Sequence, residues 1–131
     1  MALKNWAGTI QPVMVIKNST ISAAYNAVMM YGVNATVENC NISATNNNAL
    51  WISNAAMASG VTGTITVKGN TSITAGSDYK RLNAGSGHSI VVVAGTYNFD
   101  PSNCNSKNYV DSTAFDVTDN GNNTWSVVAK A

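Results

Sequence analysis

Two stretches of this chain repeat one another. VIKNSTISA begins at Val15 and TVENCNISA begins at Thr36, so the two copies lie 21 residues apart. A repeat of about 20 residues built from short β-branched runs indicates units that stack, each presenting the same face to the next. This feature constrains the fold more than any other part of the sequence. The identical pairs are Asn18/Asn39, Ile21/Ile42, Ser22/Ser43 and Ala23/Ala44.

The pattern continues along the chain. GTITVKGNTSITA at 63–75 and HSIVVVAGTYNF at 88–99 are related lines, and the apolar pieces AVMMYG and ALWIS follow the first two copies at 27–32 and 49–53. Short β-branched runs separated by Asn or Gly predict short strands joined by tight turns. Each unit therefore holds three strands in about 20 residues, with insertions near 54–61 and 76–87. Residues 54–60 are the best candidate for a short turn of helix.

These units predict an all-β fold, a short right-handed parallel β-helix of about four to five coils. Stacked strands lie about 4.8 Å apart, so Ile21 would lie on Ile42 inside and Asn18 on Asn39 outside, with their amides bonded along the column. Leucine-rich repeats are excluded because Leu occurs only at positions 3, 50 and 82. Helical solenoids are excluded because Asn, Ser and Thr are poor helix formers. A left-handed β-helix ranks second and a β-sandwich third.

The C-terminal part has a different pattern. YVDSTAFDVTDNGNNTWSVVAK at 109–130 reads as two strands around a turn at Asp119-Asn120-Gly121. A solenoid needs a cap, because its last rung otherwise exposes unpaired backbone groups. We therefore expect a single domain with coils at 1–101 and an aromatic β-hairpin cap at 102–131. The edge of the first coil, around 9–16, should be covered by Trp6 and its neighbours, by another chain or by a preceding domain.

Charge and hydropathy exclude several partners. Only 10% of the residues are charged, against about 25% in an average globular protein, and the net charge is +1. The chain therefore offers no basic face to nucleic acid and no segment for membrane insertion. The start MALKNWAGTI carries no signal peptide. Either the protein works without secretion by that route, or the chain is a piece of a longer secreted protein.

Metal and cofactor chemistry finds little support in the sequence. Cys40, Cys104 and the sole histidine cannot assemble a zinc set. A disulfide between the two cysteines stays open, although the repeat places Cys40 in an inward slot where it would act as a small hydrophobe. Glu38 is the only acid before Asp78, so the first two units cannot supply the carboxylates of a polysaccharide lyase or glycosidase. We therefore predict no catalytic residue, no metal site and no cofactor.

The last third of the chain carries a recognisable pattern. AGTYNFDPSN at 94–103 is followed by YVDSTAFDVTDNGNNTWSVVAKA at 109–131. These segments resemble the C-terminal end of right-handed parallel β-helix modules in surface proteins of gut-type Gram-positive bacteria, which end in G-G-T-F/Y-x-x-D-P-S-x-Y-V and then D-N-G-x-x-T-W/Y-x-V. Ala94 replaces the first Gly, and CNSK at 104–107 looks like an insertion. The earlier units are similar to the pectin-lyase-like superfamily only as generic β-helix. Because functions in such a family are mixed, the resemblance implies fold more than role.

Four residues are candidates for contact with a ligand. The densest polar segment is SDYKRLNAGSGH at 77–88, where Tyr79 is a candidate platform for a sugar ring, Arg81 a candidate donor and His88 a further contact. Trp51 is the fourth candidate, again for stacking. The simpler interpretation is a solvated inserted loop, with Trp51 in ordinary packing.

Together these patterns favour a non-enzymatic structural module that presents a face to a partner, a glycan or a protein on a surface. It would belong to the bacterial cell surface as part of a larger protein, or to a phage virion as a capsid decoration or tail protein. A polysaccharide-binding or polysaccharide-cleaving β-helix is the third alternative. Self-association into a homo-oligomer is a further expectation, because the first coil leaves an open edge.

Overall fold

The structure is a computed structural model that describes residues 2–4, 12–53, 62–76 and 80–131. The described residues form strands, turns and bends without an α-helix, so they include no helix that could cross a membrane. The helical turn expected at 54–60 lies outside them. The all-β class and the parallel pairing of the strands are confirmed.

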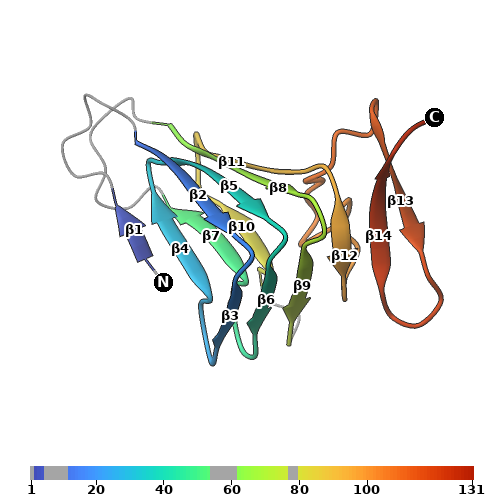
Figure 1. The fold of residues 1–131 in the computed structure, drawn as a ribbon, viewed down its shortest axis with the longest axis horizontal. Coiled ribbons are helices and arrows are strands. Elements are labelled where there is room, and N and C mark those ends of the chain that lie inside the picture. Colours follow the sequence, from blue (N-terminus) through green and yellow to red (C-terminus); the bar gives the residue numbers. More distant parts are fainter. Residues whose placement is uncertain (1, 5–11, 54–61, 77–79) are drawn as a thin grey trace.

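The strands belong to three sheets, and the chain passes through the sheets in turn (Figure 1). We call one passage through all three a circuit. The first sheet contains β1 (Ala2–Lys4), β4 (Val28–Tyr31), β7 (Leu50–Ser53) and β10 (Leu82–Ala84). The second contains β2 (Val13–Lys17), β5 (Asn34–Glu38), β8 (Thr64–Lys68) and β11 (Ser89–Val92). The third contains β3 (Thr20–Ala23), β6 (Asn41–Ala44), β9 (Ser72–Ala75), β12 (Gly95–Tyr97), β14 (Trp125–Ala129) and β13 (Phe115–Asp119).

The register between circuits follows the sequence repeat. Ile16 lies opposite Val37 in the pair β2–β5, and Ile21 lies opposite Ile42 in the pair β3–β6. The next circuit continues the columns, with Val67 opposite Val37 and Ile73 opposite Ile42. Because a one-residue slip would turn every apolar side chain outward, this alternation holds the register.

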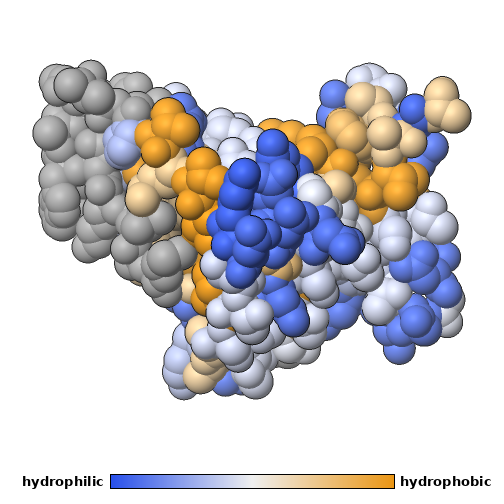
Figure 2. All heavy atoms as spheres, in the orientation of Figure 1, coloured by the Kyte–Doolittle hydropathy of each residue, from blue (hydrophilic) through white to orange (hydrophobic). Residues whose placement is uncertain are grey.

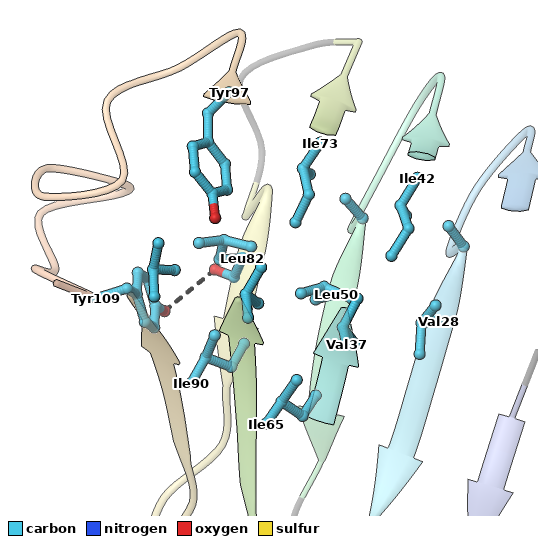
Figure 3. Packing of buried hydrophobic residues seen from close by; sticks show 14 of the residues in the cluster. Val28, Val37, Ile42, Leu50, Ile65, Ile73, Leu82, Ile90, Tyr97 and Tyr109 are labelled. Carbon is cyan, nitrogen blue, oxygen red and sulfur yellow. Dashed lines mark hydrogen bonds between the residues drawn. The ribbon is translucent and has the colours of Figure 1, made fainter. Parts of the chain in front are cut away.

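The core lies between the three sheets. Figure 3 shows side chains from all three sheets pointing into this space, where Val37, Ile42, Leu50, Ile65 and Ile73 have no exposed surface. Alternate residues of each strand point inward, because successive side chains of a strand face opposite sides. Cys40 and Cys104 are both buried and both free, so no disulfide joins them.

Tight bends join the second sheet to the third. Asn18 has a φ of 52°, Asn39 one of 54° and Gly69 one of 67°. This left-handed conformation is open to Gly and, among other residues, most readily to Asn. The Asn in the repeated line therefore marks the corner at which the chain turns from one sheet into the next.

The two ends of the stack differ. In the first circuit the inward side chains Met14, Ile16 and Ile21 are only partly buried, whereas their partners one circuit further, Ala35, Val37 and Ile42, are buried. The strands β1, β2 and β3 each form one edge of their sheet. Within the described residues, no strand pairs with the outer edge of β2 or β3.

A cap covers the opposite end. The expected hairpin is present, since β13 and β14 pair antiparallel, and β14 in turn pairs antiparallel with β12. Tyr97 and Phe99 are buried with their rings edge to face at 5.6 Å. The Tyr109 hydroxyl donates a hydrogen bond to the carbonyl of Leu82 at 3.1 Å (Figure 3). The segment around Tyr109 covers the ends of the first and second sheets, while the hairpin covers the end of the third.

Candidate binding pocket

A hollow of about 420 Å³ lies at the capped end, between the loop that follows β10 and the segment at 107–109. One wall comes from the last circuit, through residues 84–90, and the other from the cap, through Lys107, Asn108 and Tyr109. Its volume lies within the range of about 300–1,000 Å³ that small-molecule sites occupy.

His88 lines this pocket in a fixed orientation. The backbone N–H of Gly63 donates a hydrogen bond to His88 Nδ1 at 2.9 Å. Since Nδ1 acts as the acceptor, the neutral ring carries its proton on Nε2, which is then the donor available to a ligand. Burial lowers the pKa of His88 below its usual value and so favours this neutral form.

A tight turn forms the floor beside His88. The N–H of His88 donates to the carbonyl of Gly85 at 2.9 Å, and Gly87, the third residue of the turn, has a φ of 81°. A type II turn requires such a positive φ at its third position, which explains the Gly. No hydrogen bond between described residues uses the backbone N–H of Ser86 or of Gly87.

A second tight turn carries Lys107. Cys104 and Lys107 exchange two backbone hydrogen bonds, at 2.8 Å and 3.1 Å. Between them, Asn105 and Ser106 have φ values of 52° and 63°, the pair of positive angles typical of a type I′ turn. This turn places Lys107 Nζ 3.5 Å from the carbonyl of Ala84, so the ammonium stands at the pocket with capacity for further acceptors.

The rest of the cap wall is internally bonded. Tyr109 uses its hydroxyl on Leu82, as described, and burial raises the pKa of this phenol. Asn108 Oδ1 accepts from the N–H of Val110 at 2.8 Å, and its Nδ2 donates to Ser112 Oγ at 3.0 Å. These two residues therefore shape the wall, whereas His88, Lys107 and the turn at 85–88 supply the polar groups with free capacity.

The four sequence-derived ligand residues do not meet in one place. His88 lines the pocket. Arg81 lies with its guanidinium 5.5 Å from the centre of the buried Phe99 ring, and its Nε is buried without a partner among the described residues. Trp51 lies in β7, in line with Met29 of β4 and Asn83 of β10. Tyr79 falls outside the described residues.

The predicted asparagine column takes a different form. Asn39 Oδ1 accepts a hydrogen bond from the backbone N–H of Asn70 at 2.8 Å, and no amide-to-amide bond between Asn18 and Asn39 is present in the described structure. An amide-to-amide bond is found at a turn where none was expected, from Asn48 Nδ2 to Asn26 Oδ1 at 2.9 Å. These two residues are 22 residues apart, one more than the repeat spacing, so the repeat gave no signal for this pair.

The third sheet presents an uncharged outer row. Successive pairings align one short hydroxyl or amide side chain from each of its six strands. The charged residues of the neighbouring sheet are grouped at the sheet corner, where Glu38 lies 3.2 Å from Lys17 and 4.0 Å from Lys68. Figure 2 shows a hydrophilic patch near its middle, over the region where the second sheet turns into the third. The row consists of Thr20, Asn41, Ser72, Thr96, Ser126 and Thr118.

The carboxylates of the described residues are engaged away from the pocket. Asp100 accepts from Ser102, Asp111 accepts from Thr113, and Asp116 lies 3.7 Å from Lys130. The Thr113 hydrogen bonds lower the pKa of Asp111. Among the described residues no group of three or more His, Cys, Asp or Glu side chains is placed to hold a metal ion. Among the described residues that line the pocket, Lys107 is the charged one.

Comparison of the chain with protein-family models, with curated proteins and with solved structures finds no match.

Proposed function

We propose that this chain forms a short right-handed parallel β-helix and serves as a non-enzymatic structural module for attachment and assembly. The order in which the chain visits the three sheets supports the β-helix, because each sheet receives one strand from every circuit. The register of like residues between circuits supports it further. In this proposal the module belongs to a surface, that of a bacterial cell or of a phage particle.

The contrast between the two ends of the stack carries the proposal. The cap buries the last circuit under aromatic side chains, whereas the first circuit keeps Met14, Ile16 and Ile21 only partly buried. Two apolar side chains on β2 are also largely open to solvent, Val13 at 78% and Val15 at 56%. An edge strand with apolar neighbours is a template for pairing with another strand. The first circuit is therefore the assembly surface, and the cap is the free end.

The resemblance of the last third to surface-protein modules supports the same assignment. Several residues of the matching pattern make the contacts of the cap. Tyr97 is buried and donates its hydroxyl proton to the carbonyl of Ala94 at 2.6 Å, Tyr109 bonds Leu82, and Trp125 pairs with Tyr97 across the strands. The pattern thus describes the closing of a β-helix, which is a structural role.

The test is the solution mass of the chain, measured by light scattering on a sizing column over a concentration series. We expect the mass to rise above 13.7 kDa with concentration, because first circuits of two copies pair with one another. A mass that stays at 13.7 kDa throughout would contradict assembly through this edge.

One substitution can block the edge without disturbing the fold. The Asn18 N–H donates to the Glu38 carbonyl, and the Pro12 carbonyl accepts from the Asn34 N–H. The backbone N–H and C=O groups of the even-numbered residues of β2 therefore point toward β5. Alternation then turns the N–H of Val15 toward the open edge. Val15→Pro removes that donor and is tolerated on edge strands. We expect Val15→Pro to remain monomeric, while the control Val15→Thr associates like the unmodified chain.

A further inference from the structure

We propose that the pocket between the turn at 85–88 and Lys107 binds a tetrahedral oxyanion, the phosphate or sulfate ester of an organic ligand. The proposal is independent of the assembly described above. The pocket lies beside β10 and β11, at the capped end, whereas assembly uses the first circuit at the far edge of the same sheets.

The electrostatics of the pocket favour an anion. Lys107 contributes a full positive charge, and no Asp or Glu among the described residues lines the hollow. The chain as a whole is nearly neutral, with seven basic and six acidic residues. The positive charge at the pocket is therefore a local feature, because the described carboxylates are engaged with partners elsewhere. An ammonium in a concave site without a competing carboxylate raises the local concentration of anions.

The number of donors favours a tetrahedral anion over a carboxylate. The described groups that line the pocket with donor capacity include Lys107 Nζ, His88 Nε2, the hydroxyls of Ser86 and Ser89, and the backbone N–H groups of Ser86 and Gly87. A phosphate or sulfate ester offers three terminal oxygens with several lone pairs, whereas a carboxylate offers two oxygens. Backbone N–H groups of a Gly-containing turn are a common element of phosphate and sulfate sites.

The donors are held in place before any ligand arrives. The bond from Gly63 fixes the ring of His88, and the turn from Gly85 to His88 fixes the two free N–H groups. The turn from Cys104 to Lys107 fixes the backbone from which the lysine side chain extends. A site whose donors are already oriented loses little conformational entropy on binding. The remaining volume, in a hollow of about 420 Å³, leaves room for the organic part of the ligand beside Tyr109.

Titration followed by amide NMR shifts tests the proposal on the intact chain. The probes are inorganic phosphate, inorganic sulfate and, as the planar control, acetate. We expect saturable shifts of the amides of Ser86, Gly87 and Lys107 with phosphate or sulfate, at an affinity at least tenfold higher than for acetate. Saturation by phosphate alone supports a phosphate ester, and saturation by sulfate alone supports a sulfate ester. Equal affinity for acetate, or the absence of saturable shifts with both tetrahedral anions, would overturn the proposal.

Two matched pairs of variants locate the site. Ser86 is the second residue of its turn, a position where Pro is favoured, so Ser86→Pro removes the N–H while keeping the turn, and Ser86→Ala removes only the hydroxyl. We expect Ser86→Pro to weaken phosphate binding at least tenfold and Ser86→Ala less. Lys107→Met should weaken it at least tenfold, whereas Lys17→Met, at the opposite end, should leave it unchanged. Equal effects of Lys107→Met and Lys17→Met would overturn the proposal, because they would show that the anion is attracted by overall charge and not by this pocket. The phosphate, sulfate and acetate titrations of the unmodified chain test the same point without a variant.

Discussion

At the corner between the second and third sheets, asparagine acts mainly through its backbone conformation. At Asn18 and Asn39 the chain adopts a positive φ at a corner between sheets, and in the third circuit Gly69 takes the same place. A Cβ on Gly69 would lie 2.5 Å from Asn39 Oδ1, so the Asn side chain of one circuit fills the space left by the Gly of the next. Residue choice at this corner therefore follows conformation first and side-chain bonding second.

This account predicts different losses of stability for two small replacements of Asn39. Asn39→Ala should lower the free energy of unfolding by about 1–2 kcal/mol, because alanine resists the left-handed conformation. Asn39→Gly should lower it less, although both variants lose the bond to the Asn70 N–H. Urea denaturation followed by fluorescence measures both. A larger loss for the glycine variant would contradict a backbone role.

The second prediction at the residue scale concerns His88 and pH. Burial lowers the folded-state pKa of His88 below the unfolded value near 6.5, so protons bind preferentially to the unfolded chain. The free energy of unfolding should therefore be fully retained above pH 6.5 and fall as the pH drops below it toward the folded-state pKa. Protonation also removes the acceptor that Nδ1 offers to the Gly63 N–H.

Denaturation curves between pH 5 and 8 measure this dependence. His88→Asn is the control, because its amide oxygen can accept from the Gly63 N–H but does not titrate. We expect the slope below pH 6.5 to become shallower in the control. Equal slopes for both proteins would assign the pH dependence to the carboxylates instead.

At the scale of elements, the joint between stack and cap is the pairing of β12 with β14. Gly95 lies in this joint opposite Val127, with a φ of 110°. A Cβ at this position would lie 2.5 Å from the carbonyl oxygen of Thr71, the residue that precedes β9. This carbonyl already accepts a hydrogen bond from the N–H of Thr96. Close approach of the backbones therefore excludes a side chain here.

Gly95→Ala should accordingly destabilise the cap. We expect a loss of about 1–3 kcal/mol in thermal or urea unfolding, with earlier loss of the Trp125 fluorescence signal. The matched control is Gly121→Ala, since Gly121 also has a positive φ of 82° but a Cβ there meets no atom within 4 Å. Its loss reports backbone strain alone. A Gly95→Ala loss no larger than that of the control would show that the backbones can separate without cost.

The elements that the sequence predicted best are those fixed by a repeat or by a turn signal. The pairing of Ile21 with Ile42 follows from identical lines, and the hairpin follows from Asp119-Asn120-Gly121. The bond between Asn26 and Asn48 was missed because these residues lie in turns, 22 rather than 21 residues apart, outside the repeated strands. Strand alternation specifies which side chains enter the core, but it says little about turns.

The pocket could not be predicted for a related reason. Its walls come from 84–90 and 107–109, segments that meet only because the cap folds back over the last circuit. Arg81 shows the same limit in reverse. Its charge indicated a surface donor, but the cap brings Phe99 beneath its guanidinium. Contacts between a repeat and its cap depend on tertiary docking, for which a single sequence carries no periodic signal.

At the scale of the whole molecule, stability should rise from the open edge toward the middle of the stack. In a linear array each unit gains stability from its neighbours. Ile42 has neighbours on both sides and is fully buried, whereas Ile21 occupies the equivalent place in the first circuit and is only partly buried. An isoleucine thus occupies the same position in two circuits, with a paired strand on one side at Ile21 and on both sides at Ile42.

Alanine substitution at both positions tests this gradient. Ile42→Ala should lower the free energy of unfolding by about 2–5 kcal/mol, through lost contacts and the cavity that remains. Ile21→Ala should cost less than half as much when measured at low protein concentration. Urea denaturation gives both values. Equal losses would show that the first circuit is as well covered in solution as the second.

A stack that is open at one end and closed at the other has a direction. Among the described residues no strand pairs with the outer edges of β1, β2 and β3, but beyond β12 the place of the next parallel strand is already taken by the antiparallel β14. A row of parallel circuits can therefore be extended only from the first circuit. When a second copy of this chain joins there, its own cap ends the row on that side. Two copies that meet by their open sides finish both rows at once. The hairpin that completes the fold therefore also ends a row of parallel circuits at β12, and among the described residues the outer edge left at that end belongs to the antiparallel strand β13.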